Sequence, residues 1–154
     1  MLLEFRFQNY KSFREETSFS MMAAPKQKGL DYSLINIKKQ GKDIKGLCSS
    51  VIYGSNAAGK TTVVGAMDTF RSIVLRGNIR NSEDIGSPNH AASNLSLVPN
   101  QMLTKPEPVE FLIDFVVDKF RIQYGIVMDL GFFLDAKYER KILSETLTVN
   151  GNRI

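Results

Sequence analysis

Gly54-Ser55-Asn56-Ala57-Ala58-Gly59-Lys60-Thr61 is the stretch of sequence that decides the fold. It fits the pattern G-x-x-x-x-G-K-[ST], in which the glycines let the backbone close around an anion. The amides of residues 55–60 then point inward at the N-terminus of the following helix, an end that already carries partial positive charge. The stretch therefore predicts a phosphate-binding loop, or P-loop.

The flanking residues supply the context that this motif requires. Residues 47–53 are short and apolar, and we expect them to form a buried strand that leads directly into Gly54. Beyond the loop, apolar residues recur at steps of four, three and four, which predicts an amphipathic helix over 60–74. The positions are Val63, Met67, Phe70 and Val74. Gly77-Asn78 is expected to end this helix.

The polar residues of the motif have expected roles toward ATP and Mg²⁺. Lys60 should reach the β- and γ-phosphates, and the Thr61 hydroxyl should ligate Mg²⁺. Thr62 is expected at the α-phosphate. The sequence thus predicts an α/β protein of the P-loop NTPase class.

Strand-like periodicity surrounds this unit on both sides. Residues 2–9 alternate in polarity and can pair with 16–21, and residues 25–30 read as a loop. After Pro108 the period is again two. Segments 109–117 and 120–129 predict an antiparallel hairpin, followed by strands over 132–138 and 143–149 and a tight turn at Asn150-Gly151. Between these parts, residues 77–108 are rich in Asn, Ser and Pro and read as an irregular insertion.

The composition fits one modest intracellular domain. The chain has 154 residues, 43% hydrophobic and 23% charged, with a formal net charge of +4. No apolar run approaches the roughly 18 residues that cross a bilayer, so a cytoplasmic protein is expected. Cys48 is the only cysteine and is expected in the core; with His90 as the only histidine, a His/Cys metal cluster is excluded.

Two stretches resemble one group of ATPases. Phe7-Gln8-Asn9-Tyr10-Lys11-Ser12-Phe13 is similar to the N-F-[KR]-S-F opening of SMC-like, RecF-like and OLD-like proteins. The stretch Tyr53–Thr62 resembles their [FY]-G-x-N-x-x-G-K-[ST]-[NT] loop, and the hairpin with the segment around Glu145 looks like bacterial AAA family ATPases associated with phage defence. The resemblance implies the N-terminal lobe of an ABC-type ATPase head, with a mixed sheet, a P-loop helix and antiparallel strands.

The resemblance also implies a mechanism and partners. Such ATPases dimerise head to head with ATP between the heads, and they act in DNA repair or phage defence on DNA or an effector protein. Asn56 would lie near the γ-phosphate, and Lys11 and Ser12 would flank the nucleotide. For Lys11 and Ser12 the alternative is a plain polar turn, and for Glu145 it is a surface carboxylate.

The chain departs from that group in what hydrolysis needs. No four apolar residues are followed by Asp-Glu, as in a Walker B strand, and no signature motif or switch histidine is found. Asp118 and Asp129 follow apolar pairs without a glutamate, and neither Gln101 nor Gln123 can be placed as a Q-loop glutamine. We expect residues 1–154 to be a partial domain whose C-terminal lobe lies in a longer protein, and to hydrolyse little ATP alone.

Two other functions remain open from the sequence. The chain could be complete and use ATP only as a switch or assembly ligand, as a non-catalytic interaction module. A small-molecule kinase is disfavoured by the antiparallel strands and by the absence of an arginine cluster of the kind found in a lid.

Overall fold

The computed structural model describes residues 1–24, 29–39, 42–79, 97–132 and 138–154. The predictions for residues 25–28 of the first loop, for His90 and the central part of the insertion, and for 133–137 of one predicted strand lie outside these ranges. In the described residues no helix is both long enough and apolar enough to span a membrane.

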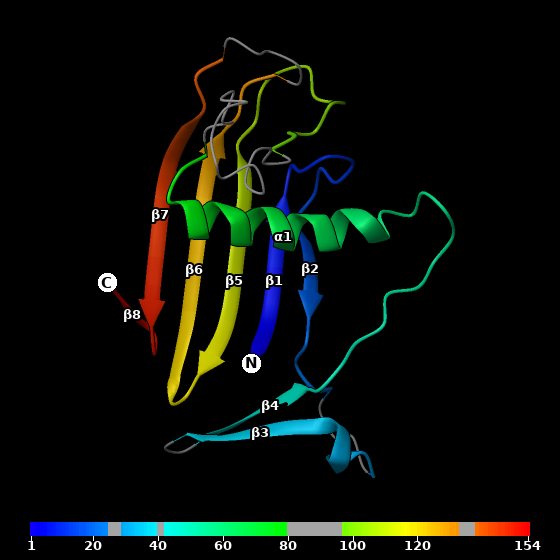
Figure 1. Cartoon of the computed structure of the whole chain (residues 1–154), viewed down its shortest axis with the longest axis vertical. Helices are drawn as coiled ribbons and strands as arrows, with labels where there is room; N and C mark the ends of the chain where they lie inside the picture. The colour runs from blue at the N-terminus through cyan, green and yellow to red at the C-terminus, as the bar shows by residue number, and fades with distance from the viewer. Residues whose placement is uncertain (25–28, 40–41, 80–96, 133–137) are drawn as a thin grey trace, which may run out of the picture.

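Six strands form one sheet in the order β2-β1-β5-β6-β7-β8 (Figure 1). The strands are β1 Leu2–Gln8, β2 Thr17–Ser20, β5 Val109–Val117, β6 Phe120–Asp129, β7 Lys141–Val149 and β8 Asn152–Arg153. The segments predicted at 2–9, 16–21, 109–117, 120–129 and 143–149 are therefore confirmed as strands. The strand predicted at 132–138 is not confirmed, because its two described residues, Phe132 and Tyr138, lie outside any strand. Every pairing between described strands is antiparallel, so the expected sheet of mixed strand direction is not found in this part of the chain.

A second, two-stranded sheet pairs β3 Leu34–Lys39 with β4 Lys42–Leu47, after a 3-10 turn at Asp31–Ser33. Neither of these two strands is predicted from the sequence. The ribbon lies beyond one end of the large sheet, below β2 in Figure 1. It is joined to the chain after β2 by backbone hydrogen bonds, among them Leu47 N–H to Met21 O at 2.7 Å.

The single described helix, α1 Lys60–Arg76, crosses one face of the large sheet (Figure 1). The predicted end is confirmed, because Gly77 adopts a left-handed φ of 68° and its amide bonds Ile73 O. The helix packs against aromatic residues of β1 and β5. The ring of Phe70 lies 5.8 Å from that of Phe5 and 6.0 Å from that of Phe111. These contacts hold the middle of α1 against the sheet.

The expected buried strand at 47–53 is wrong. Leu47 ends β4, and residues 48–53 belong to no strand of either sheet. Val51 is 82% exposed and Tyr53 89% exposed, and Cys48, expected in the core, is exposed as well. The apolar pattern was real, but a strand is buried only when neighbouring strands and a covering layer exist, and the described residues supply neither here.

Candidate nucleotide-binding site

Two residues of the loop between Tyr53 and α1 have a left-handed backbone conformation. Ala57 has a φ of 63° and Gly59 a φ of 85°, both in the left-handed region, and α1 begins at the next residue, Lys60. Alternation of left-handed and right-handed residues turns successive amides toward one side. Ala58 N–H closes the first turn on Ser55 O at 3.3 Å.

The first amides of α1 divide into two groups. Thr62 N–H and Val63 N–H both donate to Gly59 O, at 3.0 and 3.2 Å. Within the described part of the chain the amides of Lys60 and Thr61 have no acceptor, as the first donors of a helix do not. No acidic residue occupies the first turn. The loop end of α1 is thus an uncompensated positive end, suited to an anion.

Lys60 lies folded across the loop. Its Nζ donates to Gly54 O at 2.8 Å and to Ser55 O at 2.5 Å. The ammonium group is therefore held by two carbonyls at the start of the loop. Exchange of these two neutral acceptors for phosphate oxygens would give stronger, charge-assisted hydrogen bonds.

The turn between β1 and β2 lies against this loop. A Cβ placed on Gly59 would stand 2.6 Å from Cζ of Phe13, and one on Gly65 would stand 4.0 Å from Nζ of Lys11. The Lys11 ammonium also lies 5.3 Å from the centre of the Tyr10 ring. This turn, distant in sequence from the loop, thereby brings Phe13 to the last loop residue and Lys11 to Gly65 of α1, while Ser12 is exposed in the same turn.

The two aspartates that come nearest to a Walker B pattern, Asp118 and Asp129, do not join Thr61 at the loop. Thr61 is exposed in the first turn of α1. Asp118 lies in the turn between β5 and β6, and Asp129 at the end of β6 accepts from Gly131 N–H and the Tyr138 hydroxyl. Among the described residues no group of three His, Cys, Asp or Glu side chains could hold a metal ion.

Glu145 is likewise remote from the loop. It accepts a 2.6 Å hydrogen bond from the Tyr124 hydroxyl, and the Tyr124 ring packs 5.7 Å from Phe70, in the second half of α1. Partial burial, followed by the bond to Glu145, raises the pKa of Tyr124 to about 12. The surface-carboxylate reading of Glu145 fits this position.

Gln123 and Gln101 do not lie at the loop either. Gln123 donates to Asp114 at 2.9 Å, beside the Arg121 guanidinium, on the sheet face away from α1. Gln101 is exposed in the turn after Pro99. The position of the Gln123 amide is explained by the buried Asp114 carboxylate rather than by a ligand.

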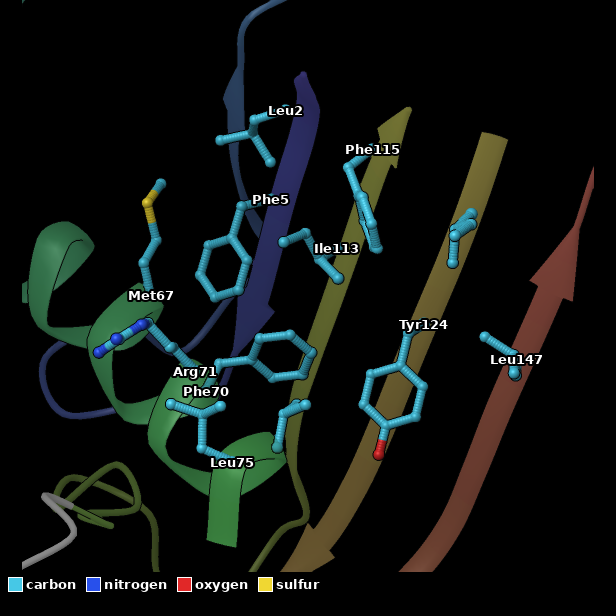
Figure 2. Close-up of a pocket in the computed structure, with 12 residues that line it drawn as sticks. Leu2, Phe5, Met67, Phe70, Arg71, Leu75, Ile113, Phe115, Tyr124 and Leu147 are labelled. Carbon is cyan, nitrogen blue, oxygen red and sulfur yellow. The ribbon is translucent and has the colours of Figure 1, made fainter. Parts of the chain in front are cut away.

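An apolar cavity of about 560 Å³ lies beside the second half of α1, away from the loop (Figure 2). The helix contributes Met67, Phe70, Arg71, Val74 and Leu75, and the sheet contributes Leu2, Phe5, Ile113, Phe115, Ile122, Tyr124 and Leu147. The sequence does not predict this cavity. Its lining comes from five elements, and the apolar residues that line it follow the same pattern as ordinary core residues.

The class of this protein follows from its match to a protein family, which supports a nucleotide-binding module of the P-loop NTPase class. Residues 49–147 match the family described as "AAA domain, putative AbiEii toxin, Type IV TA system". The chain belongs to this family of AAA domains, which implies nucleotide use and usually Mg²⁺. No curated protein and no solved structure matches the chain.

Proposed function

We propose that this chain is the N-terminal, ATP-binding lobe of an SMC-, RecF- or OLD-like ATPase. The observation that carries the proposal is the loop itself: left-handed residues at Ala57 and Gly59, two amides of α1 without an acceptor, and the Lys60 ammonium bonded to carbonyls of the same loop. A triphosphate would replace the Gly54 and Ser55 carbonyls as the partner of Lys60. In this proposal α1 is the P-loop helix of an ABC-type head.

The remaining roles follow from position in the loop. The cradle is formed by the backbone of Gly54, Ser55, Asn56, Ala57, Ala58, Gly59 and Lys60. The Thr61 hydroxyl would ligate Mg²⁺, and Thr62 would face the α-phosphate. Lys11, beside Gly65, and Ser12 would approach the nucleotide from the β1–β2 turn.

The proposal includes a second lobe, because the segment before the loop has exposed apolar side chains and unpaired backbone groups. Val51, Ile52 and Tyr53 are 82%, 38% and 89% exposed, and their backbone groups form no hydrogen bond within the described residues. An exposed apolar segment with unpaired amides and carbonyls can pair with a strand of a partner. We infer that a C-terminal lobe, carrying the Asp-Glu of a Walker B strand and a signature motif, pairs here and supports hydrolysis.

The biological setting belongs to the same proposal. Two such heads would close on ATP, in the cytoplasm, and the closure would engage DNA or an effector protein in DNA repair or phage defence. The net charge of +4 is compatible with a polyanionic partner.

Calorimetric titration of Mg·ATP into the chain, beside Lys60→Ala, tests nucleotide binding. Loss of the ammonium should weaken binding at least about tenfold, since charge-assisted bonds to phosphate are lost. Lys119→Ala, in the β5–β6 turn at the other end of the sheet, is the matched control and should bind like the unmutated chain. Equal binding by the Lys60 and Lys119 variants, or none by the folded parent chain, would overturn the proposal.

A non-catalytic module that uses ATP as an assembly ligand is the second candidate. It is favoured by one observation: the carboxylates Asp118, Asp129 and Glu145 all lie away from the loop. To separate the two candidates, phosphate release from ATP is measured after a polypeptide that carries the Asp-Glu strand has been added to the chain. Turnover that depends on Lys60 supports the ATPase, and binding without turnover supports the module.

A further inference from the structure

The ring of Phe13 stands at the boundary between the loop and the core. On one side it packs edge-on against Phe7 of β1, with ring centres 5.1 Å apart. On the other side its tip fills the space in which Gly59 would carry a side chain, 2.6 Å from the position of that Cβ. Phe13 is thus the side chain that connects the left-handed glycine of the loop to the buried sheet.

The turn that carries Phe13 is closed and anchored. Tyr10 N–H bonds Phe13 O at 2.9 Å, and Phe13 N–H bonds Tyr10 O at 3.0 Å. Tyr10 is fully buried, and its hydroxyl lies 3.1 Å from Thr69 Oγ1 of α1. Because both ends of the turn are fixed in this way, the ring has little freedom to leave Gly59.

The same turn is bonded to the chain that follows the insertion. Lys11 N–H donates to Val98 O at 2.9 Å, and Asn100 N–H donates to Asn9 O at 3.1 Å. The buried Asn9 amide also donates to the carbonyls of Glu107 and Pro108. A continuous set of contacts therefore leads from Gly59 through Phe13 to residues 98–100.

We propose that Phe13 is a positioning residue that holds the loop in its nucleotide-competent form and connects loop occupancy to residues 98–100. The inference rests on the proposed binding of ATP at the loop. Only a loop with Gly59 in its left-handed form presents the amides before α1 to phosphate. If packing of Phe13 favours that form, bound nucleotide must equally favour the packing of Phe13 and the closed turn, because coupling between sites is reciprocal.

The loop can be tested first without nucleotide. Thr62 N–H and Val63 N–H both bond Gly59 O, so their hydrogen exchange reports the conformation of Gly59. Phe13→Ala should speed exchange at these two amides. Phe120→Ala, a half-exposed phenylalanine at the start of β6, is the matched control and should leave them unchanged. Unchanged exchange at Thr62 and Val63 in Phe13→Ala contradicts the inference whatever the chain binds.

Nucleotide affinity gives the second readout. If the competent form is reduced to about a tenth of the population in Phe13→Ala, the Kd for Mg·ATP rises about tenfold. Phe13→Leu keeps an apolar contact and should restore most of the affinity. Phe13→Tyr adds an oxygen at the ring tip, where Gly59 stands, and should weaken binding although the ring is kept. A general loss of stability would not separate Leu from Tyr in this order.

Amide exchange with and without Mg·ATP tests the connection to residues 98–100. In the parent chain nucleotide should slow exchange at Lys11 and Asn100, and in Phe13→Ala this slowing should disappear even at saturating ATP. If the parent chain binds ATP and the two amides do not respond, or respond equally in the variant, the inference fails and the proposed function stands. If the parent chain binds no ATP, both fail.

Discussion

The hydroxyl groups of Tyr10 and Thr69 lie 3.1 Å apart between the β1–β2 turn and α1, and both residues are buried. Tyr10 comes from the N-terminal motif and Thr69 from the helix that the loop opens. This contact fixes the turn that carries Lys11 and Phe13 relative to the helix that begins at Lys60. The hydrogen bond is therefore one of the constraints that keep the site assembled.

Tyr10→Phe and Thr69→Val should each lower the free energy of unfolding by about 1 kcal/mol, because each leaves one buried hydroxyl with a lost hydrogen bond. The double variant should lose clearly less than the sum of the two, since it leaves no hydroxyl of the pair behind. Urea unfolding of the four proteins measures this coupling. Strict additivity would show that the hydroxyls do not interact.

The Asp114 carboxylate provides a second prediction, on the sheet face away from α1. It is 2% exposed, and the Arg121 guanidinium donates to it from Nε at 3.0 and 3.1 Å and also from Nη2. These bonds raise the pKa of Arg121. Arg121→Met would leave a buried, poorly compensated carboxylate, so we expect a loss of about 2 kcal/mol in chemical denaturation.

The control for this prediction is the exposed pair of Arg71 and Asp68, whose charged atoms are 4.0 Å apart. Arg71→Met should change stability by no more than about 0.5 kcal/mol. Adding Asp114→Val to Arg121→Met should recover part of the loss, because the buried charge is removed with its partner. Equal effects of Arg71→Met and Arg121→Met would refute the assignment.

How far the fold follows from the sequence depends on whether a segment's partners are local. The hairpin of β5 and β6 was predictable, because two alternating segments meet at a two-residue turn and pair with each other. The ribbon of β3 and β4 was missed. Its short strands mix lysines with a few isoleucines and leucines, and Ile35 is 42% exposed, so no core-facing pattern marks them.

The features of the candidate site also divide into those that the sequence predicts and those that it does not. The loop residues are contiguous, and the chemistry predicted for them follows from their spacing; it stays a prediction. The exposure of residues 51–53 could not be derived, since an apolar pattern shows what a segment requires and not what lies beside it. The contact of Phe13 with Gly59 joins two distant parts of the chain, and only the β1–β2 turn and the start of α1 together create it.

Tyr124 leads to a prediction about pH. Its pKa is raised from 10.0 to about 12, mainly by partial burial and then by the Glu145 carboxylate. The folded form therefore keeps this proton more tightly than the unfolded form. The associated stability is fully present below pH 10 and is lost as the pH rises from about 10 to 12.

Comparison of the chain with Tyr124→Phe measures this effect. The difference in phenolate absorbance between parent and variant reports Tyr124 alone and should titrate with a midpoint near 12. The variant should also lack the loss of stability that ionisation of Tyr124 causes in the parent chain at alkaline pH. Glu145→Gln should move the midpoint back toward 10, although not fully, because burial is the larger cause. A difference midpoint near 10 would contradict the burial seen beside Phe70.

Ala57 offers a direct test of the loop conformation. Its φ of 63° is left-handed, which costs a residue with a Cβ roughly 1–2 kcal/mol relative to glycine. Ala57→Gly relieves this strain but gives the unfolded chain more freedom, which costs about 0.4–1 kcal/mol. We expect a net gain of up to about 1 kcal/mol in the free energy of unfolding.

The neighbouring Ala58→Gly is the matched control, because Ala58 is not among the residues with positive φ. It adds the same freedom to the unfolded chain without relieving strain, so it should destabilise by about 0.4–1 kcal/mol. Thermal or urea unfolding of the two variants side by side cancels most effects that are common to a loop glycine. If Ala57→Gly is no more stable than Ala58→Gly, the left-handed turn at Ala57, and with it the inward direction of the loop amides, is wrong.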